Sequence, residues 1–172
     1  MVQVRQQSYQ EAGRDIDLAA WLGGLPLDLP TEDIQPLQHA CRLARSALDL
    51  PGQETPGWAP EVDCFVAGLD MALILAELQV GLEGLIAGIL YRSVRESRLS
   101  LEKVQAEFGD EVVGLIRGVL RMAAIGDLRI AHDAPVLGQA HGQKDNIRKM
   151  LISLVDDVRV ALIKLSERTC AI

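Results

Sequence analysis

The sequence predicts an all-α fold, a single helical bundle of about seven to nine helices. Three observations favour this class. Apolar side chains recur three or four positions apart along most of the chain. The chain is 49% apolar but only 3% aromatic, so its core must consist mainly of Leu, Ile, Val and Ala, which suits packed helices better than a sheet. Its 172 residues are also the length of one domain.

Charge and hydropathy argue against several classes of protein. A net charge of −7 disfavours broad binding to the phosphate backbone of nucleic acid. No apolar run reaches the roughly 18 to 20 residues of a membrane span, and the N-terminus lacks the apolar segment of a signal peptide. We therefore expect a cytoplasmic protein without membrane contact. The following cysteines and histidines lack metal-ligand spacing, and we expect the thiols to be reduced core residues: Cys41, Cys64, Cys170, His39, His132 and His141.

Residues 1–30 are predicted to form an N-terminal arm that is partly disordered. This segment is polar and then interrupted by glycines and prolines, so only a short helix is expected, around Ile16 to Leu22. Thr31 is predicted to cap the next helix, with Arg42 and Arg45 opposite its buried face. That face contains Leu37, Ala40, Cys41, Ala44 and Leu48.

Two strongly apolar helices are predicted at the centre of the fold. The first, about Glu61 to Leu78, is apolar nearly all round. Gly81 separates it from the second, Leu82 to Ser97, and so short a connection makes the two antiparallel neighbours. The apolar stripe of the second helix meets Tyr91-Arg92 near its end. A phenol and a guanidinium at a buried helix end need partners, because an unpaired charge in a core is costly.

Two further helices are predicted after this pair. Ser100 reads as the N-cap of a short helix that ends at Phe108-Gly109, where glycine supplies the backbone conformation of a helix C-terminus. Asp110 begins the next helix, whose apolar stripe ends near Ile125-Gly126.

The last part of the chain contains a predicted loop and a predicted helix. Asp127 to Gly142 is the least periodic interior stretch, and we expect it to be mobile. A helical pattern resumes at about Lys144 and continues through Asp156-Asp157 towards Ile172. Because the pattern is still running where the sequence stops, we expect the chain to be a fragment of a longer protein.

Three segments carry a resemblance to a known family. They are FVAGLDMALILAEL from Phe65 to Leu78, the pair ILYRSVRES and VLRMAAI, and DNIRKMLISLVDDVRVALIKLSER from Asp145 to Arg168. Together they resemble the N-terminal region of RelA-type GTP pyrophosphokinases, in the RelA/SpoT family of (p)ppGpp synthetases and hydrolases. The resemblance implies an HD-type helical domain over residues 31–172, which in full-length members precedes a synthetase domain.

An active hydrolase of this family holds one Mn²⁺ with two histidines and two aspartates, and the ion lowers the pKa of a bound water. The resemblance places other residue types at those positions. The ligand positions fall on Ala67, Tyr91, Arg92 and Glu167, and the acidic pair that follows the HD pair falls on Arg95 and Glu96. Like charges at about 4 Å repel by roughly 4 kcal/mol at an effective dielectric near 20, so arginine at a ligand position opposes metal binding. The segment Pro51 to Val66 also lacks the basic residues with which family hydrolases grip the nucleotide.

The resemblance therefore implies a degenerate site, without a Mn²⁺ cofactor, in a catalytically inactive domain. We expect a structural or regulatory role beside the synthetase domain of a GTP pyrophosphokinase of the stringent response, with ribosome contact only through the parent protein. A corollary is that the Arg92 guanidinium occupies the vacated metal position and pairs with Glu167. The alternative is that Tyr91, Arg92 and Arg95 mark a solvated helix end, an interpretation favoured for Arg95 alone.

Two other functions remain open on the sequence. A residual metal-dependent phosphohydrolase would need another ligand set, drawn from Glu96, Asp70 or Glu167. A nucleotide-binding regulatory module would use the old pocket to hold a guanine nucleotide. Its candidate phosphate contacts are Arg148-Lys149, Lys164 and Arg168, although charges on helix surfaces are usually solvated.

Overall fold

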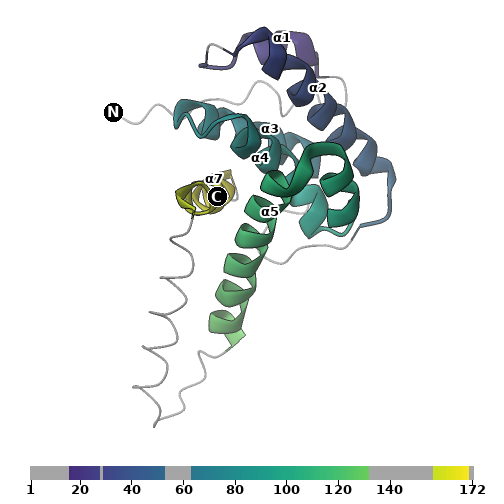
Figure 1. The fold of residues 1–172 in the computed structure, drawn as a ribbon. Helices are drawn as coiled ribbons and strands as arrows, with labels where there is room; N and C mark the ends of the chain where they lie inside the picture. Colours follow the sequence, from purple (N-terminus) through teal and green to yellow (C-terminus); the bar gives the residue numbers. More distant parts are fainter. Residues whose placement is uncertain (1–15, 28, 53–62, 132–156, 171–172) are drawn as a thin grey trace.

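The computed structural model describes residues 16–27, 29–52, 63–131 and 157–170 (Figure 1). The described residues form α-helices and one short 3₁₀ turn without any strand, which confirms the predicted all-α class. The elements are α1 (Leu18–Gly23), α2 (Thr31–Ser46), η2 (Ala47–Asp49), α3 (Cys64–Glu77), α4 (Leu82–Arg95), α5 (Leu101–Ala131) and α7 (Val158–Cys170). Within these ranges, no helix is both long enough and apolar enough to cross a membrane.

Helices α3 and α4 form the centre of the fold. The Asp63 carboxylate caps α3 by accepting hydrogen bonds from the backbone N–H groups of Phe65 and Val66. Most of α3 is buried, as its continuous apolar pattern predicts. The two helices approach closely at Gly68, where an added Cβ would overlap the carbonyl oxygen of Ile89 on α4. Only glycine permits this approach of two backbones.

The other helices cover the α3–α4 pair. Figure 1 shows α2 above the pair and α7 below it, and α2 contacts both central helices. Helix α5 packs against α4 and α7, while α7 contacts α3, α4 and α5. Arg159 strengthens the contact between α7 and α5, because its Nη1 donates to Glu111 Oε1 at 2.8 Å. Helix α7 is therefore held against three neighbours.

The second half of the predicted N-terminal arm belongs to the core. Its short helix is confirmed as α1, and the Asp17 carboxylate caps this helix. Trp21 is fully buried in the same cluster as the central helices. Arg45, predicted on the outer face of α2, instead donates from Nη2 to the Ile16 carbonyl oxygen at 2.7 Å and lies over the Phe65 ring. Residues 1–15 of the arm lie outside the described residues.

Several predicted boundaries need correction. Thr31 is the first residue of α2 and Pro30 occupies the cap position, so the threonine is not the N-cap. Ser100 does cap α5, accepting from the Lys103 N–H at 3.2 Å. Gly109 interrupts this helix as predicted, with a φ of 85° that favours glycine. The helix then continues to Ala131, past the predicted end at Ile125-Gly126.

The helix predicted to run through Asp156-Asp157 is interrupted at Asp157. Asp157 is not helical, and its carboxylate accepts from the Arg159 N–H at 2.9 Å, which places a cap where the sequence pattern suggested a continuous helix. Part of the predicted loop from Asp127 is helical, because α5 extends through those first residues to Ala131. The rest of that loop, and the helix predicted from Lys144, lie outside the described residues.

Candidate functional site

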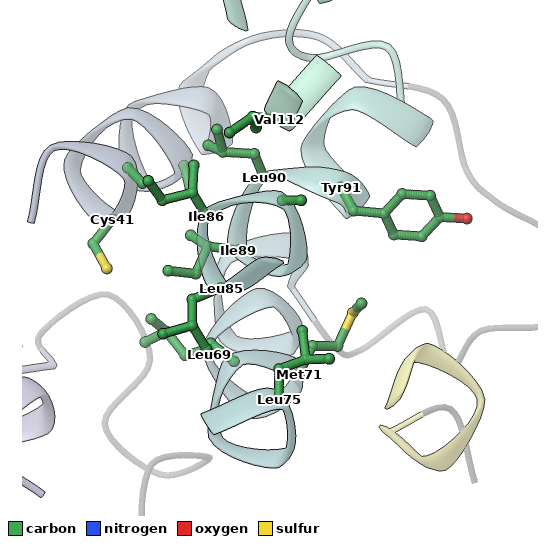
Figure 2. Packing of buried hydrophobic residues seen from close by; sticks show 14 of the residues in the cluster. Cys41, Leu69, Met71, Leu75, Leu85, Ile86, Ile89, Leu90, Tyr91 and Val112 are labelled. Atoms are coloured by element: carbon green, nitrogen blue, oxygen red, sulfur yellow. The ribbon is translucent and has the colours of Figure 1, made fainter. Parts of the chain in front are cut away.

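The C-terminal half of α4 brings bulky polar side chains into a buried position. Tyr91 is fully buried and Arg92 is only 5% exposed. Figure 2 shows the Tyr91 ring directed away from the labelled aliphatic side chains of α4. Residues four apart lie on one face of a helix, so Tyr91 shares a face with Arg95, and Arg92 shares the adjacent face with Glu96. These two faces make two separate clusters.

The first cluster surrounds Glu167 of α7, whose side chain is 3% exposed. The Tyr91 hydroxyl donates to Glu167 Oε1 at 3.2 Å. The Arg95 guanidinium also donates to Oε1, and Lys164 Nζ donates to Oε2 at 2.5 Å. One buried carboxylate thus accepts hydrogen bonds from a phenol and from two cations, and it connects α7 to α4.

The second cluster surrounds Glu96, which follows directly after α4 and is 6% exposed. Arg92 Nε donates to Glu96 Oε1 at 2.7 Å, and Arg98 Nε donates to Oε2 at 2.9 Å. Arg98 also donates through Nη1 to the Leu50 carbonyl oxygen at 2.7 Å. This cluster therefore ties the end of α4 to the segment after α2.

The electrostatics of the first cluster keep the phenol in its hydrogen-bonding form. Burial raises the pKa of Tyr91 above its ordinary value, and the Glu167 carboxylate raises it further because two adjacent anions repel. The hydroxyl of Tyr91 therefore stays protonated and serves as a donor. A thiol lies on the neighbouring face, where Ser93 donates to Cys64 Sγ at 3.6 Å and burial raises the pKa of Cys64.

The structure brings most of the predicted site residues into these clusters but changes one partner. The cation predicted to meet Glu167 was Arg92, and the salt bridge that the structure places there comes from Arg95. Arg92 is buried against Glu96 instead, so its interpretation as a solvated helix end is wrong. The same interpretation is wrong for Arg95, whose side chain is 13% exposed. Ala67 is fully buried on α3.

Two cluster members were missed as site residues or assigned another role. Lys164 was considered as a phosphate contact, and the structure engages it with Glu167. Its position three residues before Glu167 on one helix is the signal that could have identified the pair. Arg98 carried no such signal, because it lies beyond the end of α4. Arg168 is exposed, and Arg148-Lys149 lie outside the described residues.

The chemical repertoire of this region is narrow. Among the described residues, no group of three or more His, Cys, Asp or Glu side chains is placed to hold a metal ion. Asp70, a candidate for another ligand set, is buried on α3, where burial raises the pKa of its carboxyl group to about 6. The clusters are suited to joining helices through charge-assisted hydrogen bonds.

Comparison with known proteins identifies the family. The family model described as "HD domain" matches residues 40–172. A GTP pyrophosphokinase of Haemophilus influenzae is 32% identical over 155 residues, covering 90% of this chain and 20% of the relative. The Escherichia coli K12 GTP pyrophosphokinase is 31% identical over 168 residues, covering 98% of this chain and 21% of the relative. A putative chloroplastic GTP diphosphokinase of Arabidopsis thaliana is 28% identical over 141 residues, covering 81% of this chain and 15% of the relative.

The chain spans about one fifth of the length of these two bacterial relatives. The match of the family model extends over most of the chain, from the middle of α2 through α7. The identities above 30% cover nearly all of the sequence. The chain therefore belongs to the HD domain family and is related to the N-terminal region of the RelA/SpoT-type GTP pyrophosphokinases.

Proposed function

We propose that this chain is a catalytically silent HD-type domain that serves a structural and regulatory role beside a (p)ppGpp synthetase domain. Its relationship to GTP pyrophosphokinases supports the association with such a synthetase. The observation that carries the proposal is the engagement of Glu167. This residue stands at the family's last ligand position, and a phenol and two cations already occupy its carboxylate oxygens.

The side chains at this site do not fit Mn²⁺. A divalent ion needs several neutral imidazoles or carboxylates with accessible lone pairs. Ala67 offers no donor atom, and Arg95 and Lys164 bring positive charge to the one carboxylate present. A divalent ion at about 4 Å from a single cation would be repelled by roughly twice 4 kcal/mol at an effective dielectric near 20. The proposal accordingly includes no metal cofactor.

The cations Arg95 and Lys164 can replace a metal ion in its structural role, which is to hold helices together. A metal ion shared between ligands on different helices fixes those helices relative to one another. Here Glu167 on α7 joins Tyr91 and Arg95 on α4 through direct hydrogen bonds. The contact keeps α7 in place with no ion, and it engages both carboxylate oxygens of Glu167. A domain of this kind retains the fold and loses the chemistry.

Activity toward ppGpp tests the catalytic half of the proposal. The assay measures pyrophosphate released from ppGpp by the protein in Mn²⁺, with an active family hydrolase as the positive control. We expect no release above the protein-free rate, because no group in the described site can bind and activate water through a metal. Mn²⁺-dependent release that disappears in Glu167→Ala would contradict the proposal.

The regulatory half is tested in a chain that joins this domain to a synthetase domain. Glu167→Gln removes the charge that holds Arg95 and Lys164, and we expect the GTP pyrophosphokinase rate to change. Glu102→Gln alters an exposed carboxylate in the first turn of α5 and serves as the matched control, for which we expect no change. Identical synthetase rates in the wild type and Glu167→Gln would argue against regulation through this contact.

A further inference from the structure

A third buried carboxylate lies where α3 faces α7. Asp70 of α3 is 6% exposed. Among the described residues it has no hydrogen-bond or ion-pair partner, and burial is the only influence on its pKa. A buried carboxylate without a partner is costly when it is ionised. The residues next to Asp70 in the sequence are the apolar Leu69, Met71 and Ala72, so a charged residue at this position calls for an explanation.

The titratable group that faces Asp70 from α7 is the Cys170 thiol. Burial raises the pKa of Cys170 to about 12, and the charge of Asp70 adds to this increase. The thiol is therefore neutral near neutral pH and supplies no counter-charge. The described parts of α2 and α4, which also pack against α3, present no charged or titratable group to Asp70.

This carboxylate lies one helical turn from the residues of the degenerate site. Asp70 follows Ala67 by three positions on α3, and Cys170 follows Glu167 by three positions on α7, so each pair shares a face of its helix. The contact of α7 with the central helices thus has two parts. Glu167 holds α7 through its donors, and Asp70 places an uncompensated group one turn further along.

We propose that Asp70 makes the packing of α7 against α3 pH-dependent, with α7 held tightly while the carboxyl group is protonated and loosened when it ionises. Loss of hydrolase activity is not required for this behaviour. Ionisation requires solvation of the carboxylate, and water reaches it most readily when the last turn of α7 moves away from α3. Cys170, which is partly exposed in the closed form, is then exposed further together with Asp70.

The direction of the effect follows from linkage. Burial raises the pKa of Asp70 to about 6, well above that of a solvated aspartate. The closed junction therefore retains its proton at a pH where an open junction has already released it. The contribution of Asp70 to closure is fully present below about pH 4 and is lost as the pH rises through about 6. Over this range the equilibrium constant shifts towards the open junction by up to about 100-fold.

Thiol labelling at Cys170 tests the proposal. The rate of reaction with a maleimide is measured at about pH 5 and about pH 8 in the wild type and in Asp70→Asn, with buried Cys41 of α2 as the internal reference. At the lower pH, where an open junction is already largely ionised, we expect the wild-type Cys170 rate to exceed that of Asp70→Asn by a smaller factor than at the higher pH. At the higher pH we expect a several-fold faster rate in the wild type. The charge of Asp70 alone would slow labelling by raising the thiol pKa, so its direct electrostatic effect has the opposite sign.

A second measurement covers the case in which Asp70→Asn alters the fold itself. Urea unfolding should find this variant more stable than the wild type near pH 8, and by a smaller margin near pH 5. The exposed substitution Glu102→Gln should show no such dependence on pH. The proposal is overturned if Cys170 is labelled no faster in the wild type at the higher pH. A variant that is destabilised equally at both pH values would overturn it as well.

Discussion

Glu167 is the residue at which the proposed loss of metal chemistry and the stability of the fold meet. Its side chain is 3% exposed and is shared between Arg95 and Lys164. Glu167→Gln preserves the shape but leaves two largely buried cations short of one carboxylate. We expect the free energy of unfolding to fall by about 3 kcal/mol, the range found when one partner of a buried pair is removed. Equilibrium urea unfolding measures this loss.

Tyr91→Phe is the matched comparison at the same carboxylate. It removes one hydrogen bond of 3.2 Å and leaves the charges in place, so we expect a loss of about 1 kcal/mol. The informative result is which of the two variants loses more free energy of unfolding. If Glu167→Gln costs no more than Tyr91→Phe, the cations do not depend on this carboxylate, and the ionic description of the cluster fails.

The sequence identified the residues of this cluster more accurately than their partners. It predicted that the polar end of α4 would meet Glu167, but it assigned the contact to Arg92. Helical geometry explains the difference, because Tyr91 and Arg95 are four positions apart and point to α7 together. The same four-residue spacing places Arg92 beside Glu96, with which it forms a salt bridge. The spacing was present in the sequence, whereas the distance of each face from α7 required the fold.

The close approach of α3 and α4 sets the relative positions of Asp70 on α3 and of Tyr91 and Arg95 on α4. An added methyl group at Gly68 would overlap the Ile89 carbonyl oxygen, and a backbone atom cannot move aside as a side chain can. Gly68→Ala should therefore force the helices apart and cost about 1 to 3 kcal/mol, despite the better helix propensity of alanine. Thermal unfolding measures the loss.

Gly114→Ala on α5 provides the control for helix propensity. Apart from its chain neighbours and the nearby backbone of α5 itself, no described atom lies within 4 Å of a Cβ built at Gly114, so this substitution should stabilise the helix slightly. Equal melting temperatures for Gly68→Ala and Gly114→Ala would show that the close approach of α3 to α4 is not a constraint.

Elements were predicted well where one local signal decided the outcome. The periodic apolar pattern identified α2, α3 and α4, and Gly109 marked the break in α5 because a φ of 85° suits glycine. Predictions failed where two signals competed. Gly126 suggested an end to α5, but a single glycine costs a helix only about 1 kcal/mol and the helix continues. Asp157 caps α7, although the apolar pattern runs across it.

At the scale of the whole molecule, the sequence predicted the all-α architecture, and the resemblance pointed to the polar end of α4 and to Glu167 as the candidate site. The cluster around Glu167 depends on contacts between residues more than 70 positions apart, namely those of Tyr91 and Arg95 with Glu167. No local pattern encodes such a pairing. The burial of Asp70, which has no partner among the described residues, also depends on contacts between helices that are distant in sequence. The candidate site therefore lies at a junction of helices that are distant in sequence.

The final prediction concerns the response of the whole fold to metal ions. A ligand that binds only the native state at 100 times its dissociation constant stabilises it by about 2.7 kcal/mol, which shifts Tm by roughly 5 to 10 °C for a chain of this size. We expect Mn²⁺ at about 1 mM, or its removal by a chelator, to change Tm by less than about 1 °C, because Arg95 and Lys164 oppose a divalent ion at Glu167. Differential scanning calorimetry with Mg²⁺ as the control measures the shift. Stabilisation by Mn²⁺ that is lost in Glu167→Gln would mean that the carboxylate exchanges its cations for the metal, and the domain would then have to be treated as a metal-responsive one.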